Sequence, residues 1–212
     1  MSFEVELKAH VADEERVRQA LAPFCSSCVR EDKSDVYYSL PGGPALFRIR
    51  YESYGDKRPY VLFTHKKQTK EGNVEVNEEH EFTASSDQFP ACQSFALSLG
   101  YVEYIRKEKH GWSMMIALEG EETAHAELVE VPPLGWFLEM ECVLSSKEHI
   151  PSAKATLHKL LSLSGIEESQ VEGRYYMEML RSGKEQDGHD HADHGEDCVP
   201  SGLPLPKDHT EQ

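Results

Sequence analysis

Apolar and charged residues alternate in the first strand-like segment of the chain. In Phe3–Lys8 the odd positions are Phe, Val and Leu, and the even positions are Glu, Glu and Lys. Side chains along a β-strand point alternately to its two faces, so this pattern predicts a strand with one apolar and one charged face. A strand on the surface of an ordinary protein can show the same alternation, so this segment alone leaves both interpretations open.

The alternation recurs along the chain, between breaks rich in Gly and Pro. Strands with charge on one parity are predicted at residues 46–51, 60–67, 74–82, 101–109 and 136–143. Further strands are predicted at residues 35–40, 112–118 and 124–131. Amphipathic helices are predicted after Asp13, after Ser85 or Ser86, at about 152–163 and around 174–180.

Many strands and few long helices predict an α+β protein, mainly antiparallel β, whose sheet closes into a barrel and so leaves no unpaired edge. We expect the helices to pack outside against the apolar strand faces, so that the charged faces surround the lumen. Charges can be buried in this way only if they are paired, hydrated or neutralised by a ligand. The alternative is a β protein with an apolar interior and these charges on its outer face.

The predicted lumen combines carboxylates with cations. The carboxylates are Glu4, Glu6, Glu79, Glu81, Glu139 and Glu141, and the cations are Lys8, Arg48, Arg50, Lys66, Lys107 and Lys109. Carboxylate oxygens are the ligands that Mg²⁺ prefers, and Lys and Arg bind phosphate oxygens. Together they are the groups required for metal-assisted phosphoryl transfer from a triphosphate.

Charge and composition narrow the choice of partners. The formal net charge of the 212 residues is −16, which argues against a nucleic acid or an anionic membrane as partner. No apolar run reaches the roughly 20 residues needed to cross a bilayer, and we expect a cytoplasmic protein. The five cysteines do not suggest a disulfide framework. Cys25 and Cys28 have the spacing of half a zinc site or of a redox pair, but ordinary thiols are the favoured interpretation.

The composition changes near residue 182. Residues 183–212 contain eight acidic and two basic residues and almost no large apolar side chains. We therefore expect a folded domain at residues 1–181 and an acidic, disordered tail at residues 182–212. His189, His191 and His194 could bind a metal weakly, but a solvated tail is favoured.

Short motifs along residues 1–181 resemble, in their order, those of the CYTH superfamily, the triphosphate tunnel metalloenzymes. The motifs are ExExK at 4–8, RxR at 48–50, TxK at 64–66, ExE at 79–81, KxK at 107–109, LGWFLEME at 134–141 and YMEML at 176–180, with Arg174 beside the last. The superfamily includes class IV adenylyl cyclases, thiamine triphosphatases and inorganic tripolyphosphatases.

The resemblance implies an eight-stranded antiparallel tunnel and a role for each matching residue. A catalytic Mg²⁺ or Mn²⁺ is expected at Glu4, Glu6, Glu139 and Glu141, and Glu79 and Glu81 are expected to support the site. The triphosphate is expected to bind Lys8, Arg48, Arg50, Lys66, Lys107, Lys109 and Arg174. Glu6, Lys8 and Lys66 are the expected catalytic residues.

Three positions depart from the family pattern. Asn77 stands where an Arg often precedes the ExE motif, and Lys109 replaces the usual Arg, which loses a bidentate fork. Val129 stands where many members have an Asp; Glu127 or Glu130 could substitute, although Glu130 is predicted on the opposite face from Val129.

The motifs are compatible with more than one activity. Hydrolysis requires only a water in line with the terminal phosphoryl group, whereas cyclisation requires a nucleoside pocket for a ribose hydroxyl. We expect a triphosphatase acting on inorganic tripolyphosphate or on an organic or nucleoside triphosphate. The alternatives are a class IV adenylyl cyclase that makes cyclic AMP and pyrophosphate from ATP, and a polyphosphate-binding module without activity. The oligomeric state stays open.

Overall fold

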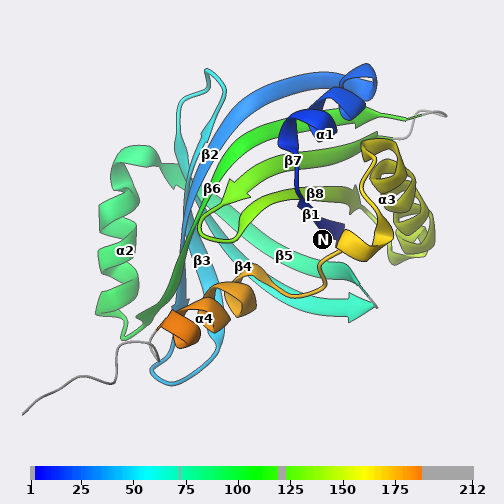
Figure 1. Cartoon of the computed structure of the whole chain (residues 1–212). Helices are drawn as coiled ribbons and strands as arrows, with labels where there is room; N and C mark the ends of the chain where they lie inside the picture. Colours follow the sequence, from blue (N-terminus) through cyan, green and yellow to red (C-terminus); the bar gives the residue numbers. More distant parts are fainter. Residues whose placement is uncertain (1–2, 72, 119–122, 188–212) are drawn as a thin grey trace, which may run out of the picture.

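A computed structural model describes residues 3–71, 73–118 and 123–187. Within these residues the strands close into an antiparallel barrel in the order β1-β5-β4-β3-β2-β6-β7-β8 (Figure 1). The strands are β1 (Phe3–Val11), β2 (Cys25–Ser39), β3 (Ala45–Tyr54), β4 (Tyr60–Glu71), β5 (Val74–Ser85), β6 (Val102–Ala117), β7 (Thr123–Val131) and β8 (Gly135–Leu144). The predicted eight-stranded closed tunnel is confirmed.

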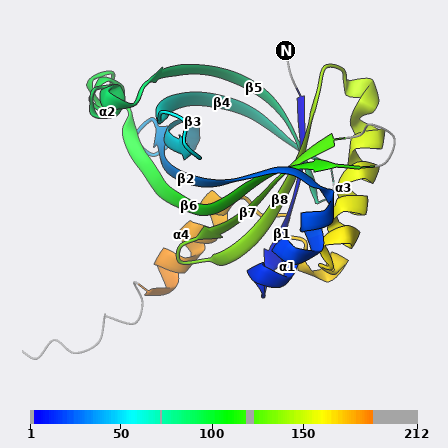
Figure 2. The same ribbon diagram turned by 90° about the horizontal axis from the view of Figure 1, so that it is seen from above.

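Within the described residues, four α-helices pack around the barrel. They are α1 (Glu14–Leu21), α2 (Phe89–Ser98), α3 (Ile150–Ser164) and α4 (Tyr176–Asp187), and single turns of 3₁₀-helix occur at Ala22–Phe24, Ser86–Gln88, Lys147–His149 and Glu168–Gln170. Helices α1 and α3 flank one side of the barrel and α2 the opposite side (Figure 2). Asp13 caps α1 by accepting a hydrogen bond from the Arg16 backbone N–H (3.0 Å). None of these helices is long and apolar enough, within the described residues, to cross a bilayer.

The main apolar core lies between the barrel wall and the helices, not inside the barrel. Val5 and Leu7 of β1, which carry the apolar parity of that strand, are buried in one cluster with Leu157 and Leu160 of α3. A second cluster joins Ala96 of α2 to the outer faces of β2, β3 and β4. The other parity of each strand is therefore directed into the lumen, as the alternation predicts.

One predicted break is wrong. The sequence predicts separate strands at residues 101–109 and 112–118, but β6 runs without interruption through Gly111. Gly111 lies opposite Val129, and a Cβ at this position would overlap the carbonyl oxygen of Leu128. The glycine permits a close approach of β6 to β7 instead of forming a turn.

Two other boundaries shift. β2 begins at Cys25, ten residues before the predicted strand at 35–40, so Cys25 and Cys28 lie on this strand as free thiols. Helix α4 continues to Asp187, whereas the last helix is predicted around residues 174–180. Residues 188–212, with His189, His191 and His194, lie outside the described residues, so the disordered tail stays a prediction.

Candidate active site

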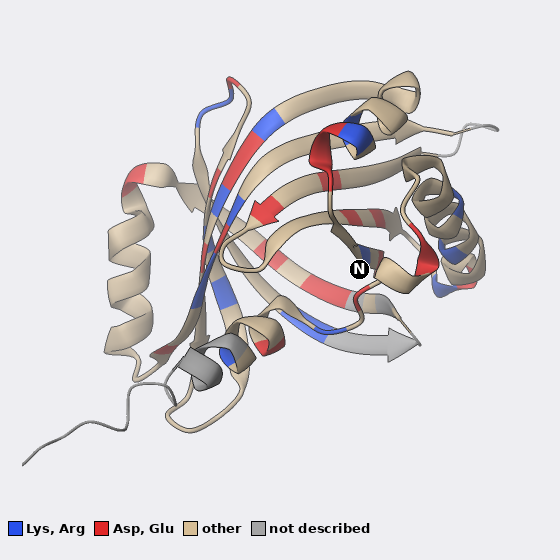
Figure 3. Cartoon of the chain, viewed as in Figure 1, with Lys and Arg blue, Asp and Glu red and all other residues tan. Residues whose placement is uncertain are grey.

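Side chains from the strands and from the start of α4 line a cavity of about 220 Å³ inside the barrel. Charged residues recur along the strands that form its wall (Figure 3). All six predicted carboxylates and all six predicted cations of the lumen line this cavity. Glu127 is a seventh carboxylate of the lining, and Leu46, Leu62 and Met177 add apolar surface.

The cations of β3 and β6 surround one buried carboxylate that the sequence did not single out. Asp35 on β2 is fully buried, and its Oδ1 and Oδ2 accept hydrogen bonds from Arg50 Nε (2.6 Å) and Nη2 (3.0 Å). Lys107 Nζ lies 3.1 Å from Asp35 Oδ2, and Arg48 Nη1 lies 3.8 Å from it. Burial alone would raise the pKa of Asp35, but the charges of Arg50, Lys107 and Arg48 hold it well below its usual value.

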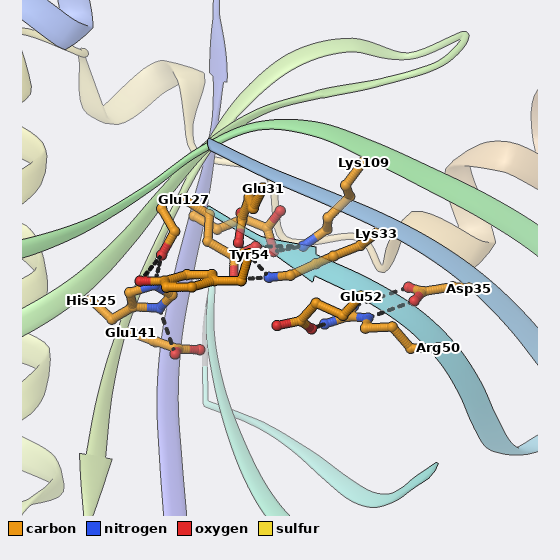
Figure 4. A network of polar contacts seen from close by, with 12 residues as sticks. Glu31, Lys33, Asp35, Arg50, Glu52, Tyr54, Lys109, His125, Glu127 and Glu141 are labelled. Carbon is orange, nitrogen blue, oxygen red and sulfur yellow. Dashed lines mark hydrogen bonds and ion pairs between the residues drawn. The ribbon is translucent and has the colours of Figure 1, made fainter. Parts of the chain in front are cut away.

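A second buried ionic group adjoins the cavity (Figure 4). Lys33 Nζ contacts Glu127 Oε1 (2.5 Å) and Glu31 Oε2 (3.0 Å). Lys109 Nζ lies 3.2 Å from Glu127 Oε2 and 2.6 Å from Glu139 Oε2. Burial would raise the pKa of Glu127, but Lys109 and Lys33 hold it well below the usual range. Of the two residues that could substitute for the missing Asp at position 129, Glu127 faces the cavity and Glu130 is exposed. Val129 itself is buried in an apolar cluster.

Tyr176, the first residue of α4, extends into the lumen. Its hydroxyl donates a hydrogen bond to Glu139 Oε1 (2.8 Å). Its ring lies 4.8 Å from the Nζ atoms of Lys8 and Lys107 and 5.4 Å from that of Lys109. A buried aromatic face stabilises such ammonium groups, so α4 helps to gather three of the predicted phosphate-binding lysines.

The strands β4 and β5 complete the polar wall. Lys66 Nζ lies 3.1 Å from Glu4 Oε2 and also pairs with Glu79. Arg48 Nη2 donates a hydrogen bond to Thr64 Oγ1 (2.9 Å), and the Thr64 hydroxyl donates one to Glu81 Oε1 (2.7 Å). Glu79 thus pairs with Lys66, and Glu81 Oε1 lies 3.9 Å from Arg48 Nη2. Their supporting role stays a prediction.

The predicted metal ligands lie on adjacent strands. Glu6 of β1 is directly opposite Glu141 of β8, and Glu139 is opposite Lys8. Directly opposite residues have Cβ atoms about 5 Å apart, so the carboxylates of Glu6 and Glu141 can reach one ion between them. Their oxygen donors are those that a hard divalent cation requires.

The expected metal ligands are already engaged by other side chains. Glu4 pairs with Lys66, Glu139 with Lys109, and Glu141 Oε1 with His125 Nδ1 (2.8 Å), whose Nε2 lies 2.6 Å from Ser113 Oγ. Within the described residues, no three carboxylate, histidine or cysteine side chains converge as metal ligands. A cation would bind by replacing one of these partners.

Arg174 is the one predicted cation that does not line the cavity. Its Nε and Nη2 donate hydrogen bonds to Glu172 (3.0 and 2.6 Å), and its side chain is 61% exposed. These hydrogen bonds lower the pKa of Glu172 to about 2. The structure thus places Arg174 apart from the other six cations, and a role in binding remains a prediction. The Asn77 side chain lies outside the described residues.

A closed barrel with cations and carboxylates facing one enclosed cavity belongs to the tunnel class of fold that the resemblance implies. The CYTH domain model matches residues 2–176, and the chain belongs to the CYTH family. No curated protein matches the sequence closely enough to count as a relative.

Several solved structures resemble the chain. The PH1819 protein of Pyrococcus horikoshii OT3 is 26% identical, with a TM-score of 0.67 over 85% of this chain and 99% of that chain. A putative adenylate cyclase of Vibrio parahaemolyticus is 19% identical, with a TM-score of 0.67 over 84% and 98% of the two chains. A putative adenylyl cyclase of Hippeastrum, described as having a dominant triphosphatase activity, is 14% identical, with a TM-score of 0.60 over 86% and 96%. The last two show the fold alone.

Proposed function

We propose that this protein hydrolyses a small triphosphate by metal-assisted transfer of the terminal phosphoryl group to water. The observation that carries the proposal is the convergence of six Lys and Arg side chains on the same cavity as the carboxylates of β1 and β8. Positioning and electrostatic stabilisation supply most of the rate enhancement in phosphoryl transfer, and this cavity offers groups for both.

The charge balance of the cavity supports the need for a divalent cation. Among the residues that the structure describes, seven carboxylates and six cationic side chains line it, with Asp35 buried behind the cations. A triphosphate brings several further negative charges, which this lining does not neutralise by itself. Glu4, Glu6, Glu139 and Glu141 would hold Mg²⁺ or Mn²⁺, which would neutralise charge on the phosphoryl oxygens.

Lys8, Lys66, Lys107 and Lys109 would bind the phosphate oxygens, together with an arginine of β3. Release of Lys66 from Glu4 and of Lys109 from Glu139 would serve both ligands, because the freed lysine binds phosphate and the freed carboxylate binds metal. Glu6 and Lys8 would orient the metal and the terminal phosphoryl group for attack by water. The best substrate is inorganic tripolyphosphate or an organic or nucleoside triphosphate.

Neighbouring lysines on β4 offer a matched test of this proposal. Lys66 lines the cavity, whereas Lys67 is exposed on the opposite face of the same strand. We expect Lys66→Ala and Lys8→Ala to lower kcat/KM for phosphate release at least about a hundredfold, and Glu6→Ala to do the same, as loss of a charge-stabilising group does in other enzymes. Lys67→Ala should leave activity unchanged. Equal activity of Lys66→Ala and Lys67→Ala, with unchanged circular dichroism, would contradict the proposal.

A further inference from the structure

Asp35 lies at the centre of a row of charges that crosses three strands. β2 is hydrogen-bonded to β3 on one side and to β6 on the other, and the register sets Asp35 opposite Arg50 and opposite Lys107. A single buried carboxylate thus has a cation on each side, in addition to Arg48 at 3.8 Å. Asp35 does not itself line the cavity, so it can act on a bound anion only through the cations that it contacts.

The two arginines of β3 differ in how many of their guanidinium nitrogens already have partners in the protein. Arg50 directs Nε and Nη2 to Asp35, and its Nη1 lies 3.6 Å from Glu52 Oε2, so its planar fork faces carboxylates of the protein. Arg48 donates one hydrogen bond to Thr64, and its buried Nε has no partner among the described residues. A buried donor without a partner is costly, so Arg48 keeps hydrogen-bonding capacity that the described residues do not use.

We infer that Asp35 is a positioning residue of the anion site: it ties Arg50 and Lys107 into the barrel wall, so that Arg48, and not Arg50, is the arginine of β3 that contacts the bound polyphosphate. This inference rests on the proposed function in one respect, namely that the cavity binds a polyphosphate. Without the Asp35 carboxylate, Arg48, Arg50 and Lys107 would repel one another and lose their shared orientation.

The role of Asp35 can be separated from simple neutralisation, because the two make opposite predictions. If Asp35 only neutralised the cations, Asp35→Asn would remove one negative charge. The net charge around the cavity would become more positive by one unit, and anion binding would tighten. If Asp35 positions the cations, the same change weakens binding despite the added charge. The surface pair Glu103–Arg106 provides a control, because it has the same bidentate geometry (2.8 and 2.6 Å) on exposed residues.

The experiment measures two quantities for each full-length variant: the thermal midpoint without ligand, and the affinity for imidotriphosphate, a tripolyphosphate with NH in place of the bridging oxygens, by calorimetry with Mg²⁺. We expect Asp35→Asn and Arg50→Lys to lower both the midpoint and the affinity, the latter about tenfold or more. Arg48→Lys should lower the affinity by a similar factor with a smaller change in midpoint. Glu103→Gln should change neither.

Two results would overturn the inference. Asp35→Asn that binds imidotriphosphate as tightly as the wild type, or more tightly, would make Asp35 a neutralising group only. Arg50→Lys that loses affinity while keeping the wild-type midpoint would show that Arg50 contacts the ligand directly. If Asp35→Asn does not fold, the comparison of Arg50→Lys with Arg48→Lys decides alone.

The same measurements keep this inference distinct from the proposed function. Binding of imidotriphosphate does not require turnover, so a wild-type protein that binds it but releases no phosphate would contradict only the hydrolase proposal. A wild-type protein that does not bind imidotriphosphate would overturn both.

Discussion

Glu139 keeps its charge in the lumen because cations lie close to it. Burial alone would raise the pKa of Glu139, but the charge of Lys109 and then of Lys107 outweighs burial and the repulsion from Glu127, so its pKa lies below the usual value. Glu31, which contacts Lys33 beside the cavity, has instead a raised pKa. Burial, and then the charge of Glu127, raise the pKa of Glu31 to about 7 despite its contact with Lys33.

Glu31 therefore makes the stability of the protein depend on pH. The folded state binds the Glu31 proton more tightly than the unfolded chain, where the pKa is near 4.5. The wild-type protein should lose stability as the pH rises from about 4.5 to about 7, and the full penalty, at most about 3 kcal/mol, applies above pH 7.

Glu31→Gln should remove this penalty. We expect the variant to be more stable than the wild type at pH 8, and the difference to shrink toward pH 5, in urea unfolding followed by circular dichroism. Glu103→Gln, on the exposed outer face of β6, should show no such difference between the two pH values. A Glu31→Gln variant that is equally destabilised at both pH values would contradict the assigned protonation of Glu31.

At the scale of the elements, the main core lies outside the barrel, and this can be tested with leucines on two helices. Leu157 of α3 is fully buried against the barrel wall, whereas Leu97 of α2 is 53% exposed. Leu157→Ala should lower the free energy of unfolding by about 2–5 kcal/mol, and Leu97→Ala by about 0.5 kcal/mol or less, in urea unfolding. Equal losses in the two variants would contradict the assignment of the core.

The strands that the sequence predicts best are those in which only one face is charged. In β1, β3 and β8 the alternation gives both the strand and the residues that face the lumen. β2 is different, because residues 30–35 are all charged except Ser34, so both parities are polar. The alternation is therefore hidden in this part of β2, so the strand is predicted only from residue 35, and the lumen-facing set Glu31, Lys33 and Asp35 is not predicted. In β6, two strands are predicted, one on either side of Gly111, but the strand is continuous. A glycine is needed at this position because the backbone of β7 lies too close for a Cβ atom.

Pairing across the lumen could not be predicted from the sequence. Lys109 and Glu139 are 30 residues apart, and Lys66 and Glu4 are 62 residues apart, so these contacts depend on barrel register and side-chain conformation. The motifs located all twelve charged residues predicted to line the cavity but not the partners that hold them. Arg174 and Glu172 are only two residues apart, but the alternation pattern does not show that these side chains pair with each other outside the cavity.

At the scale of the whole molecule, the charge of the cavity predicts linked binding of anion and metal. We expect Mg²⁺ and tripolyphosphate together to raise the thermal midpoint clearly more than either alone, because neither balances the lining by itself. Ligand at about a hundredfold excess over its Kd stabilises a protein by about 2.7 kcal/mol. An equal rise with tripolyphosphate in the presence of a chelator would contradict the proposed role of the metal.

The most direct test of the proposed function identifies the products. Purified protein with Mg²⁺ or Mn²⁺ at mildly alkaline pH is offered tripolyphosphate, ATP and thiamine triphosphate separately, and phosphate, pyrophosphate and cyclic AMP are measured together. We predict phosphate without cyclic AMP from at least one substrate, with the activity lost in Lys66→Ala and retained in Lys67→Ala. Cyclic AMP and pyrophosphate from ATP would instead identify a cyclase, and the absence of all three products would leave a binding module; either result would contradict the hydrolase proposal.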